Sequence, residues 1–109
     1  MADQQLAFLR QMIGDFSPKL VELTDDVLFG DVWERPGLSK RDRSLVTITS
    51  LVTGGNFSQL ESHLQIGKGN GLTETEIIEA ITHLAFYAGW PKALTAIFLA
   101  RKVFAEEAK

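Results

Sequence analysis

Glycines divide this chain into segments of helical length, and this spacing constrains the fold more than any other feature. Between the glycines, apolar residues recur at intervals of three and four, the period of one face of an α-helix. Glycine favours the end of a helix because it readily adopts the left-handed backbone conformation of a C-cap. We therefore expect an all-α fold of about six helices, with stops at Gly14, Gly30, Gly54-Gly55, Gly69 and Gly89.

Two helices are predicted before residue 30. The first has an amphipathic face formed by Leu6, Leu9, Arg10 and Ile13. Ser17 and Pro18 are typical of the N-cap and first residue of a second helix, which we expect to continue to about Phe29. Arg35-Pro36-Gly37 then breaks the chain.

A third helix is predicted after Ser39, which serves as its N-cap. Leu45, Ile48 and Val52 repeat on one face of this helix. The run from Val46 to Thr49 is rich in β-branched residues and would also suit a strand, so both interpretations stay open for this segment.

The remaining helices have well-marked limits. The fourth is predicted from about Phe57 to Lys68, and Thr73 with Glu76 forms the capping-box pattern of the fifth. Gly89-Trp90-Pro91 turns the chain into a last helix, from Lys92 to about Glu107. The fifth helix has a wide apolar stripe: Ile77, Ile78, Ile81, Leu84, Ala85 and Ala88.

The last helix predicts an oligomer. It is apolar on nearly every side from Ala93 to Ala100. A chain of 109 residues is long enough for one core and too short for two ordinary domains. We expect residues 1–109 to form a single domain that buries this helix by assembling into a homo-oligomer.

Composition excludes several classes of function. A net charge of −3 argues against sequence-independent binding to nucleic acid, and no run approaches the roughly 18 apolar residues of a membrane span. The polar start, Met1 to Gln5, does not resemble a signal peptide, so we expect a cytoplasmic protein. The absence of cysteine excludes disulfides, thiolate metal sites and cysteine-based catalysis. The two histidines lack a carboxylate at a recognised ligand spacing, so no metal site is predicted.

The histidines differ in their surroundings. Asn56, Gln59 and His63 recur at i, i+3 and i+7, on one helix face beside an apolar stripe. His63 is therefore a candidate general acid or base, and the alternative is a solvent-facing or core-edge histidine bonded to a backbone carbonyl. His83 follows Glu79 by four residues, so a surface ion pair or an interface contact explains it.

Arg35, Arg41 and Arg43 gather around the Pro-Gly turn and the start of the third helix. Guanidinium groups there would bind carboxylates bidentately. A solvated run of charges, in which these arginines pair with Glu34 and Asp42, explains them equally well. The two tryptophans also lie at turns, where a ring either walls a pocket or covers a core edge: Trp33 and Trp90.

Several segments together resemble the carboxymuconolactone decarboxylase family. They are Asp31 to Leu38, Arg41 to Ile48, His63-Leu64, Asn70 to Ile77 and Tyr87 to Pro91. The resemblance covers nearly the whole chain. It implies a small all-helical, alkylhydroperoxidase D-like subunit that assembles into trimers or hexamers.

The same superfamily includes peroxidases whose motif is a glutamate, two cysteines three apart and a histidine four residues later. With His63 as that histidine, Ser44 takes the place of the glutamate, and Asn56 and Gln59 take the places of the cysteines. Peroxidase chemistry is therefore not expected unless a partner supplies the thiol. The chain looks more like the cysteine-less decarboxylase branch, from which Ile66-Gly67-Lys68-Gly69 departs.

The resemblance implies a cofactor-free lyase that removes CO2 from a carboxylated γ-lactone in the catabolism of aromatic compounds, giving 3-oxoadipate enol-lactone. Such a reaction needs a cation for the substrate carboxylates and an acid that protonates the carbanion or dienolate. Arg35, Arg41 or Arg43 would supply the cation and His63 the acid. Supporting roles are expected for Ser44 and Gln59 as hydrogen-bonding groups and for Trp33 as a ring that excludes water. A non-catalytic oligomeric binding protein for a small acid ligand is the alternative.

Overall fold

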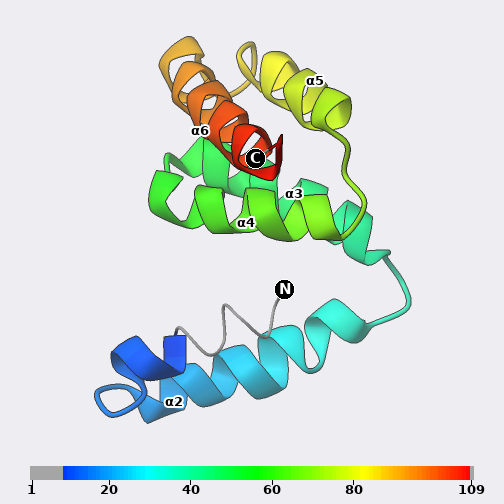
Figure 1. Cartoon of the computed structure of the whole chain (residues 1–109). Helices are drawn as coiled ribbons and strands as arrows, with labels where there is room; N and C mark the ends of the chain where they lie inside the picture. The colour runs from blue at the N-terminus through cyan, green and yellow to red at the C-terminus, as the bar shows by residue number, and fades with distance from the viewer. Residues whose placement is uncertain (1–8, 109) are drawn as a thin grey trace. The chain divides into compact units, whose positions relative to one another are not determined.

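A computed structural model gives the fold of the protein and describes residues 9–108, with side chains described to residue 106. Within those residues all regular structure is helical and no strand occurs, so the all-α prediction is confirmed. None of the described helices is both long enough and apolar enough to cross a membrane. The chain divides into two compact units, residues 1–40 and 41–109, whose helices Figure 1 colours in chain order.

The N-terminal unit consists of short helical pieces. Residues 9–13 are helical, and they are followed by α2 (Pro18–Glu22), the π-helical η1 (Leu23–Phe29) and the 3-10 turn η2 (Val32–Glu34). Because α2 and η1 are continuous, they form the helix predicted to end near Phe29, with Gly30 as its C-cap residue. The change to π-helical hydrogen bonding was not predicted. Leu6, expected in the first helix, lies outside the described residues.

The second unit is built from four α-helices, α3 (Lys40–Gly54), α4 (Phe57–Gly69), α5 (Glu74–Leu84) and α6 (Trp90–Ala108). The β-branched run lies within α3, so the strand alternative is wrong for this segment. The hydroxyls of Thr47 and Thr49 each donate to a carbonyl one turn earlier, at 2.8 Å. Ile48 is 1% exposed, and its burial outweighs the small helical penalty of β-branched residues.

The ends of α5 and α6 follow local sequence signals. The Thr73 hydroxyl accepts a hydrogen bond from the Glu76 amide at 3.1 Å, and the Glu76 carboxylate accepts one from the Thr73 amide at 3.0 Å. This confirms the predicted capping box. α6 begins at Trp90, two residues earlier than predicted, because Pro91 fits the first helical turn, where an amide has no helical partner. α5 ends at Leu84, so the last two alanines of the predicted stripe lie in the following turn.

One hydrophobic core joins the four helices of the second unit. α6 packs against both α4 and α5 (Figure 1). Lys68 on α4 donates to the carbonyl of Val103 on α6 at 3.1 Å, and Lys102 on α6 donates to Glu61 on α4 at 2.7 Å. The most deeply buried side chains come from all four helices: Ile48, Val52, Leu60, Leu64, Ile77, Ile81, Ala96 and Val103.

Candidate functional site

Ser44 is buried where α3 meets α4. Its side chain is 0% exposed, and its Oγ accepts a hydrogen bond from Nδ2 of Asn70 at 2.9 Å. Gly67 leaves room beside it, since a Cβ at that position would lie 3.1 Å from Cδ1 of Ile48 and 3.5 Å from Cβ of Ser44. The two helices therefore approach each other closely at Gly67, and Ser44 presents no surface to solvent.

His63 lies on α4, one turn before Gly67, at the edge of the core. Its side chain is half-buried and its Nδ1 is shielded from solvent. Burial lowers the pKa of His63 from its ordinary value of 6.5, because desolvation disfavours the charged imidazolium. The ring is therefore mainly neutral at pH 7.

The other residues of the predicted polar face are exposed. Gln59 lies one turn before His63 on α4, and Asn56 is the N-cap residue of this helix without making a side-chain capping hydrogen bond. On the adjacent face, Leu60 and Leu64 are 0% exposed. The predicted arrangement of a polar face beside an apolar stripe is thus present in α4.

Arg41 and Arg43 lie in the first turn of α3 and have different surroundings. Arg41 forms ion pairs with Glu76 of α5 and with Asp42, so two carboxylates already match its charge. Arg43 is half-buried, its Nε is shielded from solvent, and its carbonyl accepts the hydroxyl hydrogen bond from Thr47. Both arginines are half-buried, and the ion pairs of Arg41 agree with the interpretation as a run of charges.

Trp33 and Arg35 belong to the N-terminal unit. Trp33 is 8% exposed and stacks on Phe29, with the ring centroids 5.7 Å apart. Its ring is therefore largely buried and packs on the last residue of η1. Arg35 is exposed directly after η2, where the neighbouring Glu34 accepts a hydrogen bond from Lys40 at 3.1 Å.

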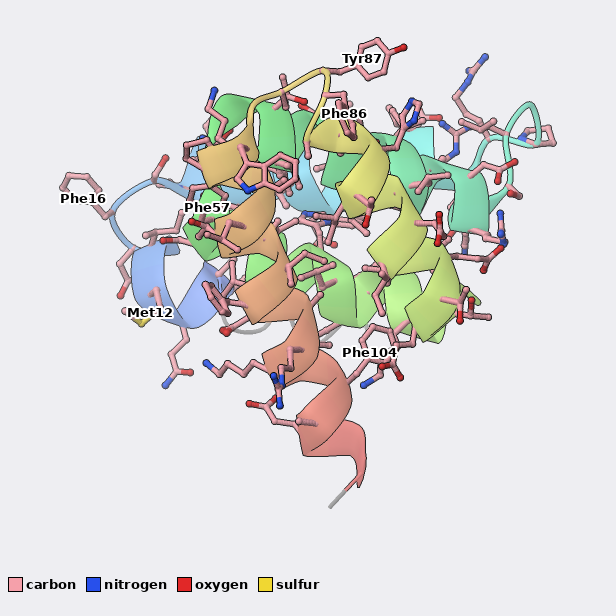
Figure 2. All side chains as sticks on the ribbon, turned by 90° about the horizontal axis from the view of Figure 1, so that it is seen from above. Met12, Phe16, Phe57, Phe86, Tyr87 and Phe104 are labelled. Carbon is pink, nitrogen blue, oxygen red and sulfur yellow. The ribbon has the colours of Figure 1, made fainter. Side chains whose placement is uncertain are left out.

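The turn between α5 and α6 carries exposed aromatic rings. Trp90 is 64% exposed and meets Phe86 edge to face, with the ring centroids 6.2 Å apart. His83 is also exposed, and its ring centroid lies 4.9 Å from that of Tyr87. Figure 2 shows Phe86 and Tyr87 at this turn, with Tyr87 pointing away from the helices. Trp90 thus forms part of a surface, unlike Trp33.

Two hollows that sequence reasoning missed open beside α6. One, of about 500 Å³, is bordered by residues that include Ile78, Ile97, Arg101 and Phe104. The other, of about 230 Å³, is bordered by apolar residues that include Ile81, Phe86, Trp90, Leu94 and Ile97. Neither is lined by the candidate residues of α3 and α4. The sequence signals for them were the apolar character of the last helix and the position of Trp90 at a turn, where a ring can wall a pocket.

The candidate residues of α3 and α4 offer four kinds of functional group. Within residues 9–108, no cluster of three or more His, Asp or Glu side chains has the arrangement to hold a metal ion. The candidates there are an imidazole, a guanidinium, an amide and a hydroxyl, belonging to His63, Arg43, Gln59 and Ser44. The imidazole is an acid or base near neutral pH, and the guanidinium is a carboxylate-binding cation.

Comparison with known proteins identifies the family. The model of the carboxymuconolactone decarboxylase family matches residues 18–102. The chain belongs to the carboxymuconolactone decarboxylase family. The resemblance of the sequence segments is thereby confirmed, together with the all-α, alkylhydroperoxidase D-like fold class. The match begins at α2 and ends within α6.

Two of the relatives of this family member are decarboxylases. The chain is 38% identical over 92 residues to a 4-carboxymuconolactone decarboxylase of Acinetobacter baylyi. The aligned region covers 84% of this chain and 69% of that protein. It is 37% identical over 81 residues to a nitrosuccinic acid decarboxylase of Metarhizium robertsii, covering 74% of this chain and 57% of that protein. An uncharacterized protein of Paracoccus denitrificans is 31% identical over 84 residues, with coverages of 75% and 63%. The match therefore spans less than two thirds of the length of the last two relatives.

Proposed function

We propose that this member of the family is a cofactor-free carboxy-lyase that removes CO2 from a carboxylated γ-lactone, with 4-carboxymuconolactone as the substrate to test first. The observation that carries the proposal is the 38% identity to a 4-carboxymuconolactone decarboxylase across 84% of the chain. The product is 3-oxoadipate enol-lactone, and the reaction belongs to the catabolism of aromatic compounds. The family match extends through both units, which supports residues 1–109 acting as one functional domain.

The substrates named for the two decarboxylase relatives pose the same chemical problem. In each acid the departing carboxylate lies on a carbon from which a nearby group withdraws electrons, a nitro group in one and an unsaturated lactone carbonyl in the other. Each acid also retains a second carboxylate. A catalyst for either must bind a dianion, favour the movement of an electron pair onto the acceptor, and supply one proton.

The proposed reaction balances without a redox step. The C–C bond to the carboxylate breaks, CO2 leaves, and the bonding electron pair moves through the C=C bond onto the lactone carbonyl as a dienolate. Protonation of the carbon next to that carbonyl then gives the enol-lactone. Each turnover therefore consumes one lactone and one proton and releases one CO2.

His63 supplies this proton in the proposal. Its ring is half-buried, so one part remains accessible while the rest is desolvated. Because burial lowers the pKa of His63, its imidazolium form is a stronger acid than that of a solvated histidine. After transfer the neutral ring regains a proton from solvent, which completes the cycle.

Arg43 is the proposed cation for a substrate carboxylate. To reach Arg41, a substrate would have to displace Glu76 or Asp42. Arg43 is partly desolvated, and a lower local dielectric strengthens its attraction for a carboxylate. In this assignment Arg41 orders the start of α3 instead of binding the substrate.

The remaining candidates have supporting roles in the proposal. Gln59 is exposed one turn before His63 and is placed to hydrogen-bond the substrate. Ser44 is buried and acts through the packing of α3 on α4. Trp33 and Arg35 belong to the N-terminal unit, and their expected roles, to exclude water and to supply a cation, stay predictions.

The protein is further proposed to form a homotrimer or homohexamer. On the outer side of α6, Trp90, Leu94 and Phe98 are 64%, 49% and 64% exposed. No charged residue interrupts this helix between Lys92 and Arg101. Contiguous exposed apolar surfaces of this kind are typical of association sites in soluble proteins.

The proposal is tested by incubating the purified protein with freshly generated 4-carboxymuconolactone and following CO2 and the product by proton NMR. Wild-type protein should release one CO2 per lactone. His63→Ala should lower kcat by about 100-fold or more, and Arg43→Ala should mainly lower kcat/KM. His83→Ala, which alters the other histidine of the chain, is the matched control and should retain activity. Saturable binding of the lactone without turnover would refute the lyase and favour a binding protein.

A further inference from the structure

The hydrogen bond between Ser44 and Asn70 lies on the side of α4 that carries His63. Asn70 follows His63 by seven residues, with Gly67 between them at a spacing of four and then three, so the three positions share one helix face. At a rise of about 1.5 Å per residue, Asn70 lies about 10 Å along the axis from His63. A contact at Asn70 therefore acts on His63 through a short, rigid stretch of helix.

Ser44 gives this bond its importance. Ser44 is the fully buried polar side chain among the residues that the structure describes, with 0% of it exposed. A buried hydroxyl without a partner is costly, because it has lost its bonds to water. The amide of Asn70 meets this need at 2.9 Å, so any relative movement of α3 and α4 that breaks the bond is disfavoured.

The backbone around Asn70 is itself held in place. The amide nitrogen of Asn70 donates to the carbonyls of Ile66 and Gly67, at 2.9 and 3.1 Å. After it, Gly71 has a φ of +105°, and the amide of Leu72 returns to the carbonyl of Gly67 at 2.9 Å. These bonds fix both sides of the residue, so its side chain reaches α3 from a defined position.

Close packing at Gly67 makes the register between the helices sensitive to this bond. A Cβ at Gly67 would come within 3.0 Å of Leu72 and 3.1 Å of Ile48. The two helices are thus in close contact at Gly67, and a slip by one residue would move α4 by about 1.5 Å along α3. Displacements of about 1 Å at reacting groups cost about 100-fold in rate.

We propose that Asn70 is a positioning residue that acts through Ser44 to fix the register of α4 against α3, and so places His63 relative to Arg43. The roles of His63 and Arg43 in this statement rest on the proposed function. The effect of the Ser44–Asn70 bond on the position of His63 does not rest on the proposed function, because this effect concerns only the packing of the two helices.

The test compares Asn70→Ala, Ser44→Ala and the double variant with Asn56→Ala. Asn56 is the matched control, since it is the asparagine at the other end of α4, exposed and without a capping hydrogen bond. The first readout is the NMR titration of the His63 ring, with the His83 ring as an internal reference. The second is kcat and KM with 4-carboxymuconolactone.

Asn70→Ala should move the titration midpoint of His63 and leave that of His83 in place. It should lower kcat by about tenfold or more with a smaller change in KM, because it misplaces a reacting group. Ser44→Ala should act in the same direction, and the double variant should lose no more than the more affected single variant. Asn56→Ala should match wild type in both readouts.

Equal His63 titrations in wild type, Asn70→Ala and Ser44→Ala would overturn the inference, even if the melting temperature falls. If Asn70→Ala does not fold, Ser44→Ala decides the matter, since alanine fills the same site and leaves no hydroxyl to satisfy. If wild-type protein shows no turnover, the proposed function fails while the titrations still test the positioning role.

Discussion

Glu76 joins the start of α5 to Arg41 at the start of α3. Its Oε2 pairs with the Arg41 guanidinium, while its Oε1 accepts the Thr73 amide at 3.0 Å. One side chain thus closes a capping box and links two helices whose residues lie 35 positions apart in the chain. The proposed function gives Arg41 an ordering role at the start of α3 and keeps Arg43 as the cation for the substrate carboxylate.

Glu76→Gln should leave kcat/KM nearly unchanged, whereas Arg43→Gln should lower it. Glu76→Gln keeps the capping box and removes the charge, so the free energy of unfolding should fall by less than about 1 kcal/mol, since solvent screens so exposed a pair. Its kcat/KM should change by less than about twofold, whereas Arg43→Gln should lower kcat/KM by about tenfold or more, as expected for a lost ionic contact. Urea denaturation and steady-state kinetics measure both. A large loss of kcat/KM in Glu76→Gln with no loss in Arg43→Gln would indicate that Arg41 binds the substrate carboxylate.

Gly67→Ala should destabilise the protein despite the better helix propensity of alanine. The added Cβ would lie 3.0 Å from Cδ1 of Leu72 and 3.1 Å from Cδ1 of Ile48. Overpacking of this kind costs about 1–3 kcal/mol, against a gain of about 1 kcal/mol from propensity. Urea denaturation gives the difference. Gly37→Ala is the control, because its Cβ would meet nothing within 4 Å, and a stabilised Gly67→Ala would contradict the close approach of α3 and α4.

His63 predicts a loss of stability in mild acid. Its pKa in the folded protein lies below the value of 6.5 that it has when solvated. The unfolded chain therefore binds more protons in this range, so the contribution of His63 is complete above the unfolded pKa and is lost as the pH falls towards the folded one. Unfolding free energies of wild type and His63→Gln, measured between about pH 7.5 and pH 5, should diverge in slope. Parallel curves would show that His63 is not desolvated.

Phe98→Glu should dissociate the assembly. Phe98 is 64% exposed on α6, and a carboxylate buried in an apolar interface loses its hydration. Light scattering after size exclusion should give wild-type protein a mass of three or six subunits of 12.1 kDa, and Phe98→Glu a lower mass. Thr75→Glu, an exposed position in the first turn of α5, should behave as wild type. A monomeric wild type would contradict the proposed oligomer.

Features that depend on near neighbours in the chain were predictable. The Thr73 and Glu76 capping box needs only a spacing of three residues, and it forms as expected. Pro18 and Gly30 mark the limits of the N-terminal helix in the same way. His63 lies at the edge of the core because the helical period places it beside the buried Leu60.

Features that depend on distant partners were not predictable. Asn70 was not singled out, because its bond to Ser44 spans 26 residues and exists only once α3 meets α4. Arg41 was expected to share the role of Arg43, since its partner Glu76 looked like a capping residue alone. The helical state of the β-branched run in α3 likewise depends on burial of Ile48 by other helices.

Decarboxylation of 4-carboxymuconolactone in D2O tests the central claim most directly, because it reports loss of CO2 and delivery of the proton together. We predict that wild-type protein releases CO2 and places one deuteron on one face of the carbon next to the lactone carbonyl. His63→Ala should be slower by about 100-fold or more, with His83→Ala unaffected. Absence of CO2 release by wild-type protein, or equal rates for wild type and His63→Ala, would contradict the account.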